Sequence, residues 1–187
     1  MALIIRIDVD RPYGRRPFLR HFLSRLSSDL YFPKVPGFGF LAELEAMLTW
    51  LEKASARAYV FFRRCTLPSK SILKLLDAGR HEIGLHLENS RSLTTFIKEM
   101  QIVENHVGRH VRAISKHGSG GAKYGFHHYA PYEPERYIEW ANVLPCVYFW
   151  AIWKTLHLSP RKRRPAYWYS PLRFGSNRPG EIRRSSR

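Results

Sequence analysis

The sequence predicts an α/β fold in which parallel strands are joined by helical crossovers. Short β-branched and aromatic runs alternate almost strictly with longer segments of helical periodicity, which is typical of parallel sheets. The chain has 187 residues, of which 44% are hydrophobic, so it is long enough to bury one sizeable core. We therefore expect functional groups at the carboxyl ends of the strands, where such sheets gather them.

The predicted strands are short runs of apolar residues bounded by turn signals. The first strand ends before Pro12 and Gly14, because proline removes a hydrogen-bond donor and glycine relaxes the backbone. The run ARAYVFFRR is long enough for a strand and too short for a helix. The predicted strands are residues 4–10, 56–64, 81–86, 110–115 and 146–153.

The predicted helices carry apolar residues three or four positions apart. The first helix follows a proline and has Phe18, Phe22 and Leu26 on one stripe. The third has the clearest ends, with Ser69 as the N-cap and Gly79 as the C-cap. The predicted helices are residues 17–29, 40–54, 69–79, 92–108 and 134–144.

The formal net charge of +16 is concentrated near the C-terminus. Residues 151–187 hold ten Lys or Arg against one Glu, and the end of this segment lacks periodicity. We expect a folded domain over residues 1–158 and a basic, disordered tail over 159–187 that contacts polyanions without specificity. A nucleic-acid-binding protein is the least favoured hypothesis, because no nucleic-acid fold motif accompanies this charge.

Cysteine usage and hydropathy indicate the compartment. Cys65 and Cys146 form neither a disulfide framework nor a CxxC pair, so a reducing environment is the simpler interpretation. No apolar run approaches the ~20 residues of a transmembrane helix, and the first strand leaves no room for an export signal. We expect a cytoplasmic protein.

Acids, bases and imidazoles follow the predicted strands. Asp8 and Asp10 are two residues apart, so both carboxylates leave the same face of the first strand. A strand with one solvated polar face is the alternative explanation for these two acids. The candidates at the strand ends are Asp8, Asp10, Arg63, Arg64, His86, Glu88, Lys116 and His117.

Three segments resemble the NodB-like polysaccharide deacetylases, metal-dependent enzymes that remove N-acetyl groups from sugars. The segments are IDVD (7–10), LLDAGRHEIGLH (75–86) and ISKHGSG (114–120), and the middle one is the most specific. The resemblance extends from about residue 3 to about residue 121. It implies a partial or distorted (β/α) barrel, an N-acetylated carbohydrate substrate and a divalent metal, with zinc expected.

The resemblance implies a role for each matching residue. Asp8 takes the place of the general base, Asp10 that of a metal ligand, and His86 that of the first histidine ligand. The chemistry agrees, because a carboxylate beside a divalent cation can take a proton from water as that water attacks an amide carbonyl.

The second histidine of the family's metal motif is missing, because Ser90 occupies its position. A hydroxyl is a poor substitute for an imidazole, so another ligand is needed. Glu88 and His117 are the two candidates, and we favour His117, although a histidine that only makes loop hydrogen bonds is the alternative. Lys116 stands where the family has an arginine that orients the catalytic aspartate. We thus predict Asp8 and Lys116 as catalytic residues, and Asp10, His86 and His117 as metal ligands.

The family's late histidine motif is also missing, since His157 comes too early in the chain for a full barrel. The leading hypothesis is therefore a metal-dependent carbohydrate deacetylase, and the alternative is an inactive relative that binds carbohydrate or metal. In the loop YGFHHYAPYEP we expect His127 and His128 at the surface. Tyr129, Tyr132 and Tyr137 could form a platform on which sugar rings stack.

Overall fold

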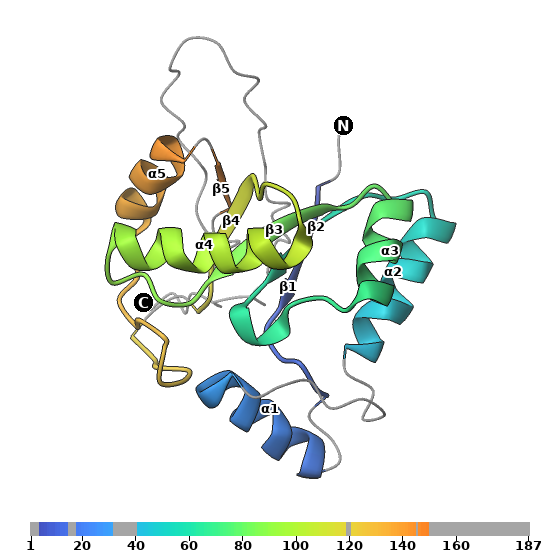
Figure 1. Cartoon of the computed structure of the whole chain (residues 1–187), viewed down its shortest axis with the longest axis horizontal. Helices are drawn as coiled ribbons and strands as arrows, with labels where there is room; N and C mark the ends of the chain where they lie inside the picture. Colours follow the sequence, from blue (N-terminus) through green and yellow to red (C-terminus); the bar gives the residue numbers. More distant parts are fainter. Residues whose placement is uncertain (1–3, 15–17, 32–40, 119–120, 145, 150–187) are drawn as a thin grey trace, which may run out of the picture. The chain divides into compact units, whose positions relative to one another are not determined.

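The computed structural model describes residues 4–14, 18–31, 41–118, 121–144 and 146–149. Its five strands form one sheet in which every neighbouring pair is parallel and the spatial order is the chain order (Figure 1). This confirms the predicted α/β fold with helical crossovers. The strands are β1 (Ile5–Val9), β2 (Ala58–Phe62), β3 (Glu82–Leu87), β4 (Ala113–Lys116) and β5 (Val147–Phe149).

Each predicted helix is present, with its ends within two residues of the expected ones. Ser69 caps the third helix by accepting a hydrogen bond from the backbone N–H of Ile72, and Ser92 caps the fourth through Thr95. A short 3-10 helix, η1 (Arg64–Thr66), adds to the prediction. The helices are α1 (Phe18–Leu30), α2 (Ala42–Lys53), α3 (Lys70–Ala78), α4 (Leu93–Val107) and α5 (Pro134–Val143).

The hydrophobic core lies between one face of the sheet and the helices. Val60, Leu85 and Ile114 from the three central strands are at most 1% exposed and belong to one apolar cluster with side chains of α2, α3, α4 and α5. Since side chains alternate along a strand, the neighbouring residues of each strand face the other way. That second face carries the polar strand residues from which the site is built.

The first helix is present as predicted, but its apolar stripe does not lie in the interior. Phe18 and Phe22 are 83% and 52% exposed. The buried residues of α1 are Ser24, Ser27 and Ser28. These serines have polar partners in the interior: Ser24 bonds the Tyr13 carbonyl, and Ser27 and Ser28 bond Cys65 of η1.

Within the described residues the sheet is open, with β1 and β5 at its edges, as in a partial barrel. Residues Met1–Ala151 form one compact unit of the chain. The predicted tail, 159–187, and His157 lie outside the described residues, so the expected polyanion contact stays a prediction. No helix in the described part of the chain is long and apolar enough to cross a membrane.

Candidate metal centre

The register of the sheet determines which polar side chains meet. Asp8 pairs with Phe61, and Phe61 pairs with Gly84, so Asp8 and Gly84 share a face. His86, two residues after Gly84, lies on that same face, directly beside its register partner Ser115. The parallel strands therefore bring acids and an imidazole to one side of the sheet near its carboxyl edge.

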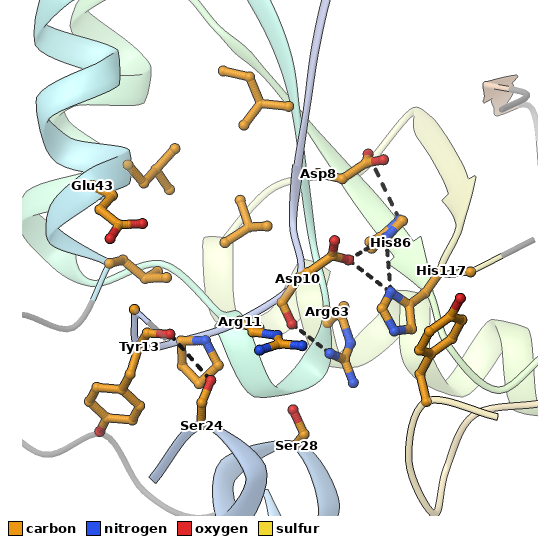
Figure 2. A pocket seen from close by; sticks show the side chains of 18 of the residues that line it. Asp8, Asp10, Arg11, Tyr13, Ser24, Ser28, Glu43, Arg63, His86 and His117 are labelled. Atoms are coloured by element: carbon orange, nitrogen blue, oxygen red, sulfur yellow. Dashed lines mark hydrogen bonds and ion pairs between the residues drawn. The ribbon is translucent and has the colours of Figure 1, made fainter. Parts of the chain in front are cut away.

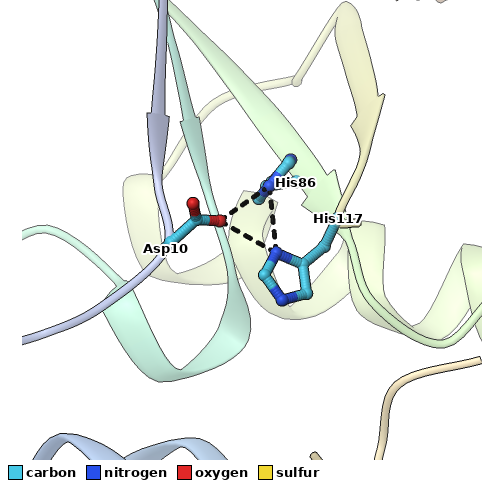
Figure 3. A group of neighbouring side chains, drawn as sticks. All are labelled: Asp10, His86 and His117. Atoms are coloured by element: carbon cyan, nitrogen blue, oxygen red, sulfur yellow. Dashed lines mark hydrogen bonds and ion pairs between the residues drawn. The ribbon is translucent and has the colours of Figure 1, made fainter. Parts of the chain in front are cut away.

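Three side chains from three strand ends converge on one point (Figure 3). Asp10 Oδ1 lies 3.0 Å from His86 Nε2 and 2.8 Å from His117 Nδ1. The two ring nitrogens are 3.2 Å apart. The Asp10 side chain is 53% exposed, whereas both histidines are buried, so access to this cluster is from the side of the carboxylate.

This spacing fits a divalent metal. Zinc–nitrogen and zinc–oxygen bonds of about 2.0–2.1 Å at tetrahedral angles put neighbouring ligand atoms about 3.3 Å apart. The three observed separations, 2.8, 3.0 and 3.2 Å, are close to that value. Two imidazoles and a carboxylate are also a ligand set that zinc uses in catalytic sites, where a fourth position stays open. Asp10, His86 and His117 together can therefore hold such an ion.

A buried serine orients His86. Ser115 Oγ lies 2.7 Å from His86 Nδ1 and is completely buried. Without a metal, His86 Nε2–H can donate to Asp10 Oδ1 while the Ser115 hydroxyl donates to Nδ1; with a metal, Nδ1 can donate to the hydroxyl and leave the Nε2 lone pair for the ion. A hydrogen bond on the far side of the ring is the usual way in which proteins fix a metal-binding histidine.

His117 is oriented by the turn that follows it. Gly118 has a φ of +66°, and a Cβ atom there would lie 2.7 Å from the Tyr124 ring. His128 closes the same turn, since its Nε2 donates to the His117 carbonyl at 2.8 Å and its Nδ1 accepts from the Tyr124 N–H. His128 was expected at the surface, but it is 1% exposed. This prediction was wrong because its two ring nitrogens satisfy backbone groups inside the loop.

The electrostatics of the cluster favour the ligand forms of its members. Burial opposes ionisation of Asp10, but the hydrogen bonds from His117 and His86 outweigh it and hold the pKa of Asp10 well below its ordinary value. Burial lowers the pKa of His117, although the hydrogen bond to Asp10 opposes this shift. Asp10 is thus a carboxylate and His117 favours the neutral imidazole, which are the forms that bind metals.

Asp8 lies beside the cluster on the same face. Its two oxygens accept hydrogen bonds from Arg6 at 2.9 and 2.7 Å, and Oδ1 lies 3.9 Å from His86 Nδ1. Arg6 therefore orients the Asp8 carboxylate. Lys116, to which we had assigned that task, donates instead to the backbone carbonyl of His117 at 2.7 Å, so its catalytic role stays a prediction.

A buried ion pair lies next to the three converging groups. Arg63 Nη2 is 2.6 Å from Glu88 Oε1, and both side chains are at most 3% exposed. Arg63 Nη1 also donates to the Asp10 carbonyl at 2.5 Å. Of the two candidates for the third ligand, the structure thus brings His117 to Asp10 and His86, whereas Glu88 binds Arg63.

Ser90 lies away from the cluster, although its place in the sequence is that of a histidine ligand in the resembled family. Its hydroxyl is completely buried and lies 3.1 Å from Tyr137 Oη. Tyr137 is itself fully buried and contacts the Tyr132 and Tyr148 rings. The suggested stacking platform is therefore wrong at Tyr137, because this ring is part of the core.

A cavity of about 870 Å³ opens in front of the cluster. Figure 2 shows Asp8, Asp10, His86 and His117 on one side of it, with Tyr13, Ser24 and Ser28 on another. Its size lies within the range of small-molecule sites, roughly 300–1,000 Å³. The cavity can therefore admit a sugar unit to the three converging groups.

Sequence reasoning missed Arg6, Ser115 and the ion-pair role of Arg63. Arg6 and Asp8 are two residues apart on one strand, and this spacing is the signal that could have identified the pair. Ser115 is recognisable only from the register between β3 and β4, which a single sequence does not reveal.

Comparisons with known proteins give a distant similarity of fold. No family model matches the chain, and no curated protein matches it. Among solved structures, a CE4 family pseudoenzyme from Bacillus anthracis is similar at 12% identity and a TM-score of 0.44. A mutant of that pseudoenzyme, described as having restored enzymatic activity, is similar at 13% and 0.41. Each similarity covers 78% of this chain, which spans less than half the length of either neighbour, 42% and 43%.

Proposed function

We propose that this protein is a metal-dependent hydrolase that removes N-acetyl groups from a sugar or polysaccharide. The observation that carries the proposal is the convergence of Asp10 Oδ1, His86 Nε2 and His117 Nδ1 at separations of 2.8–3.2 Å. Asp10, His86 and His117 hold the metal, for which zinc is the best candidate because the set combines two imidazoles with one carboxylate.

A divalent metal held by these residues would polarise the amide carbonyl and lower the pKa of a nearby water. Asp8 would be the base that accepts a proton from the attacking water, since its carboxylate lies on the same face and lines the same cavity. Arg6 keeps the Asp8 oxygens in position through two hydrogen bonds. Lys116 is the candidate for a further charge beside the reacting groups, because it is buried and lines this cavity.

The substrate class depends on the resemblance of three sequence segments to NodB-like deacetylases. Two observations on the chain agree with a carbohydrate. The cavity has room for a sugar unit, and the Tyr124 side chain, which is 49% exposed, lines it and gives apolar ring surface beside polar groups. The two described cysteines are free, which supports action in the cytoplasm.

The alternative is an inactive relative that binds metal or carbohydrate without turnover. It is favoured by one specific feature, Ser90, which occupies the position of a histidine ligand in the resembled family. Among the described residues that line the cavity and are not assigned to the metal, Lys116 is a candidate proton donor to the leaving amine.

The test is release of acetate together with metal analysis. Purified protein loaded with zinc is incubated with a panel of N-acetylated amino sugars and oligosaccharides, and acetate is measured enzymatically. We expect acetate release by the wild type, and its loss in Asp8→Asn with zinc content retained. Zinc binding without acetate release on any substrate would favour the inactive relative, and an Asp8→Asn variant that loses its zinc would make Asp8 a ligand.

A further inference from the structure

The cavity beside the proposed metal site is lined by an excess of cationic side chains. Its described lining includes the acids Asp8, Asp10 and Glu43. The cationic lining residues come from β1 and the loop after it, from α1, and from the ends of β2 and β4. They are Arg6, Arg11, Arg20, Arg25, Arg63 and Lys116.

Three of these cations are neutralised by the protein itself. Arg6 binds Asp8, and Arg63 is paired with the buried Glu88. Arg25 lies 3.8 Å from Asp29 on the same helix. The charges of these three arginines are therefore balanced by carboxylates of the protein itself.

The other three cations have no carboxylate partner in the described part of the chain. Arg11 and Arg20 make no ion pair there, and Lys116 donates only to the backbone carbonyls of His117 and Glu88. Lys116 is 6% exposed and forms no ion pair in the described part of the chain, although the nearby charges of Glu99 and Glu88 partly offset its burial.

Their positions surround the cavity. Arg11 directly follows the proposed ligand Asp10, and Figure 2 shows its side chain beside Arg63 on the side toward Ser28 of α1. Arg20 lines the cavity from α1, four residues before Ser24, so both occupy the same stripe of that helix. Arg11, Arg20 and Lys116 therefore line the same cavity, although they come from different elements of the fold.

We propose that this cavity recognises an acetylated sugar that carries an anionic group, a phosphate or a carboxylate, which Arg11 and Arg20 bind. The inference rests on the proposed function, because it assigns the substrate class of the same site. Guanidinium groups suit both anions, since their planar array of donors pairs with two oxygens at once.

The experiment compares four ligands that differ in charge. Calorimetric titration of the zinc-loaded full chain uses N-acetylglucosamine, its 1-phosphate, its 6-phosphate and its 6-carboxylate, all at one ionic strength. We expect at least one anionic ligand to bind tenfold or more tightly than the neutral sugar, with the preference decreasing as salt increases.

Variants then identify the residues responsible. Arg11→Gln and Arg20→Gln should each weaken the preferred anionic ligand about tenfold, the effect of losing one hydrogen bond to a charged group. The matched control is Arg112→Gln, an exposed arginine outside the described cavity lining, which should leave affinity unchanged. Zinc content is measured for every variant, so that loss of metal is not mistaken for loss of anion binding.

The outcomes separate the two proposals. Equal affinity for neutral and anionic sugars, or unchanged affinity in both arginine variants, would overturn the anionic substrate. Acetate release from neutral sugars alone would do the same and leave the deacetylase proposal in place. Failure of the wild type to bind zinc would overturn the deacetylase proposal, and the anionic substrate that rests on it.

Discussion

Replacing Ser115 with alanine tests whether the hydrogen bond behind His86 organises a metal site. The hydroxyl lies 2.7 Å from His86 Nδ1 and is completely buried, so water cannot take its place. Leaving a buried polar group without its partner costs about 1–3 kcal/mol. Removing the partner of a ligating histidine usually lowers metal affinity about 10–100-fold. We therefore expect Ser115→Ala to bind zinc one to two orders of magnitude more weakly than the wild type.

Ser90→Ala is the matched control. Ser90 is also completely buried and hydrogen-bonded, but its partner is Tyr137 and not a proposed ligand. Zinc affinity is measured by competition with a chromophoric chelator, and unfolding in urea is recorded for both variants. Both should lose stability, but only Ser115→Ala should lose zinc affinity. Equal zinc affinity in Ser115→Ala and the wild type would refute the reasoning, as would a similar loss in both variants.

Three further predictions concern the buried polar groups around the site. Glu88→Ala leaves the Arg63 charge buried without its 2.6 Å partner. The free energy of unfolding, measured in urea, should therefore decrease by about 3–5 kcal/mol. A decrease of less than about 1 kcal/mol would contradict this expectation and would mean that water solvates Arg63 in the variant. Ser90→His should not strengthen zinc binding, because the side chain at this position contacts Tyr137. The larger side chain overpacks the site and should lower the free energy of unfolding in urea by about 1–3 kcal/mol. Tighter zinc binding in this variant would contradict the observed geometry. Burial raises the pKa of Glu99 to about 7, so its contribution to stability is present at low pH and is lost as pH increases through 7. Relative to Glu99→Gln, the wild type should therefore lose about 1–3 kcal/mol between pH 5 and 7.5 in urea unfolding, and parallel pH profiles would contradict this.

The positions of the strands could be predicted well from the sequence, because turn-forming residues mark where the strands end. Residues directly after parallel strands must meet at one edge of the sheet, and this rule alone brought Asp10, His86 and His117 into consideration together. This rule cannot decide whether Glu88 or His117 is the third ligand, because each of them directly follows one of two neighbouring strands. The structure separates them because Arg63, one strand away, pairs with Glu88.

Other features were beyond a single sequence. The buried residues of α1 are serines and not its apolar stripe, and Ser24 Oγ donates to the Tyr13 carbonyl. Periodicity measures amphipathicity and not the nature of the neighbouring surface. In the same way, Ser90 aligns with a ligand position of the resembled family, yet local packing directs its side chain to Tyr137.

Zinc binding by the full chain and by three single variants tests the central claim most directly. The metal-free protein is titrated with zinc by calorimetry, and bound metal is then counted by mass spectrometry after gel filtration. The account predicts about one zinc per wild-type chain and at least tenfold weaker binding in Asp10→Ala, His86→Ala and His117→Ala, with His110→Ala, an exposed histidine, as the unaffected control. A wild type that holds no zinc, or a His117→Ala variant that binds it as tightly as the wild type, would contradict the proposed site.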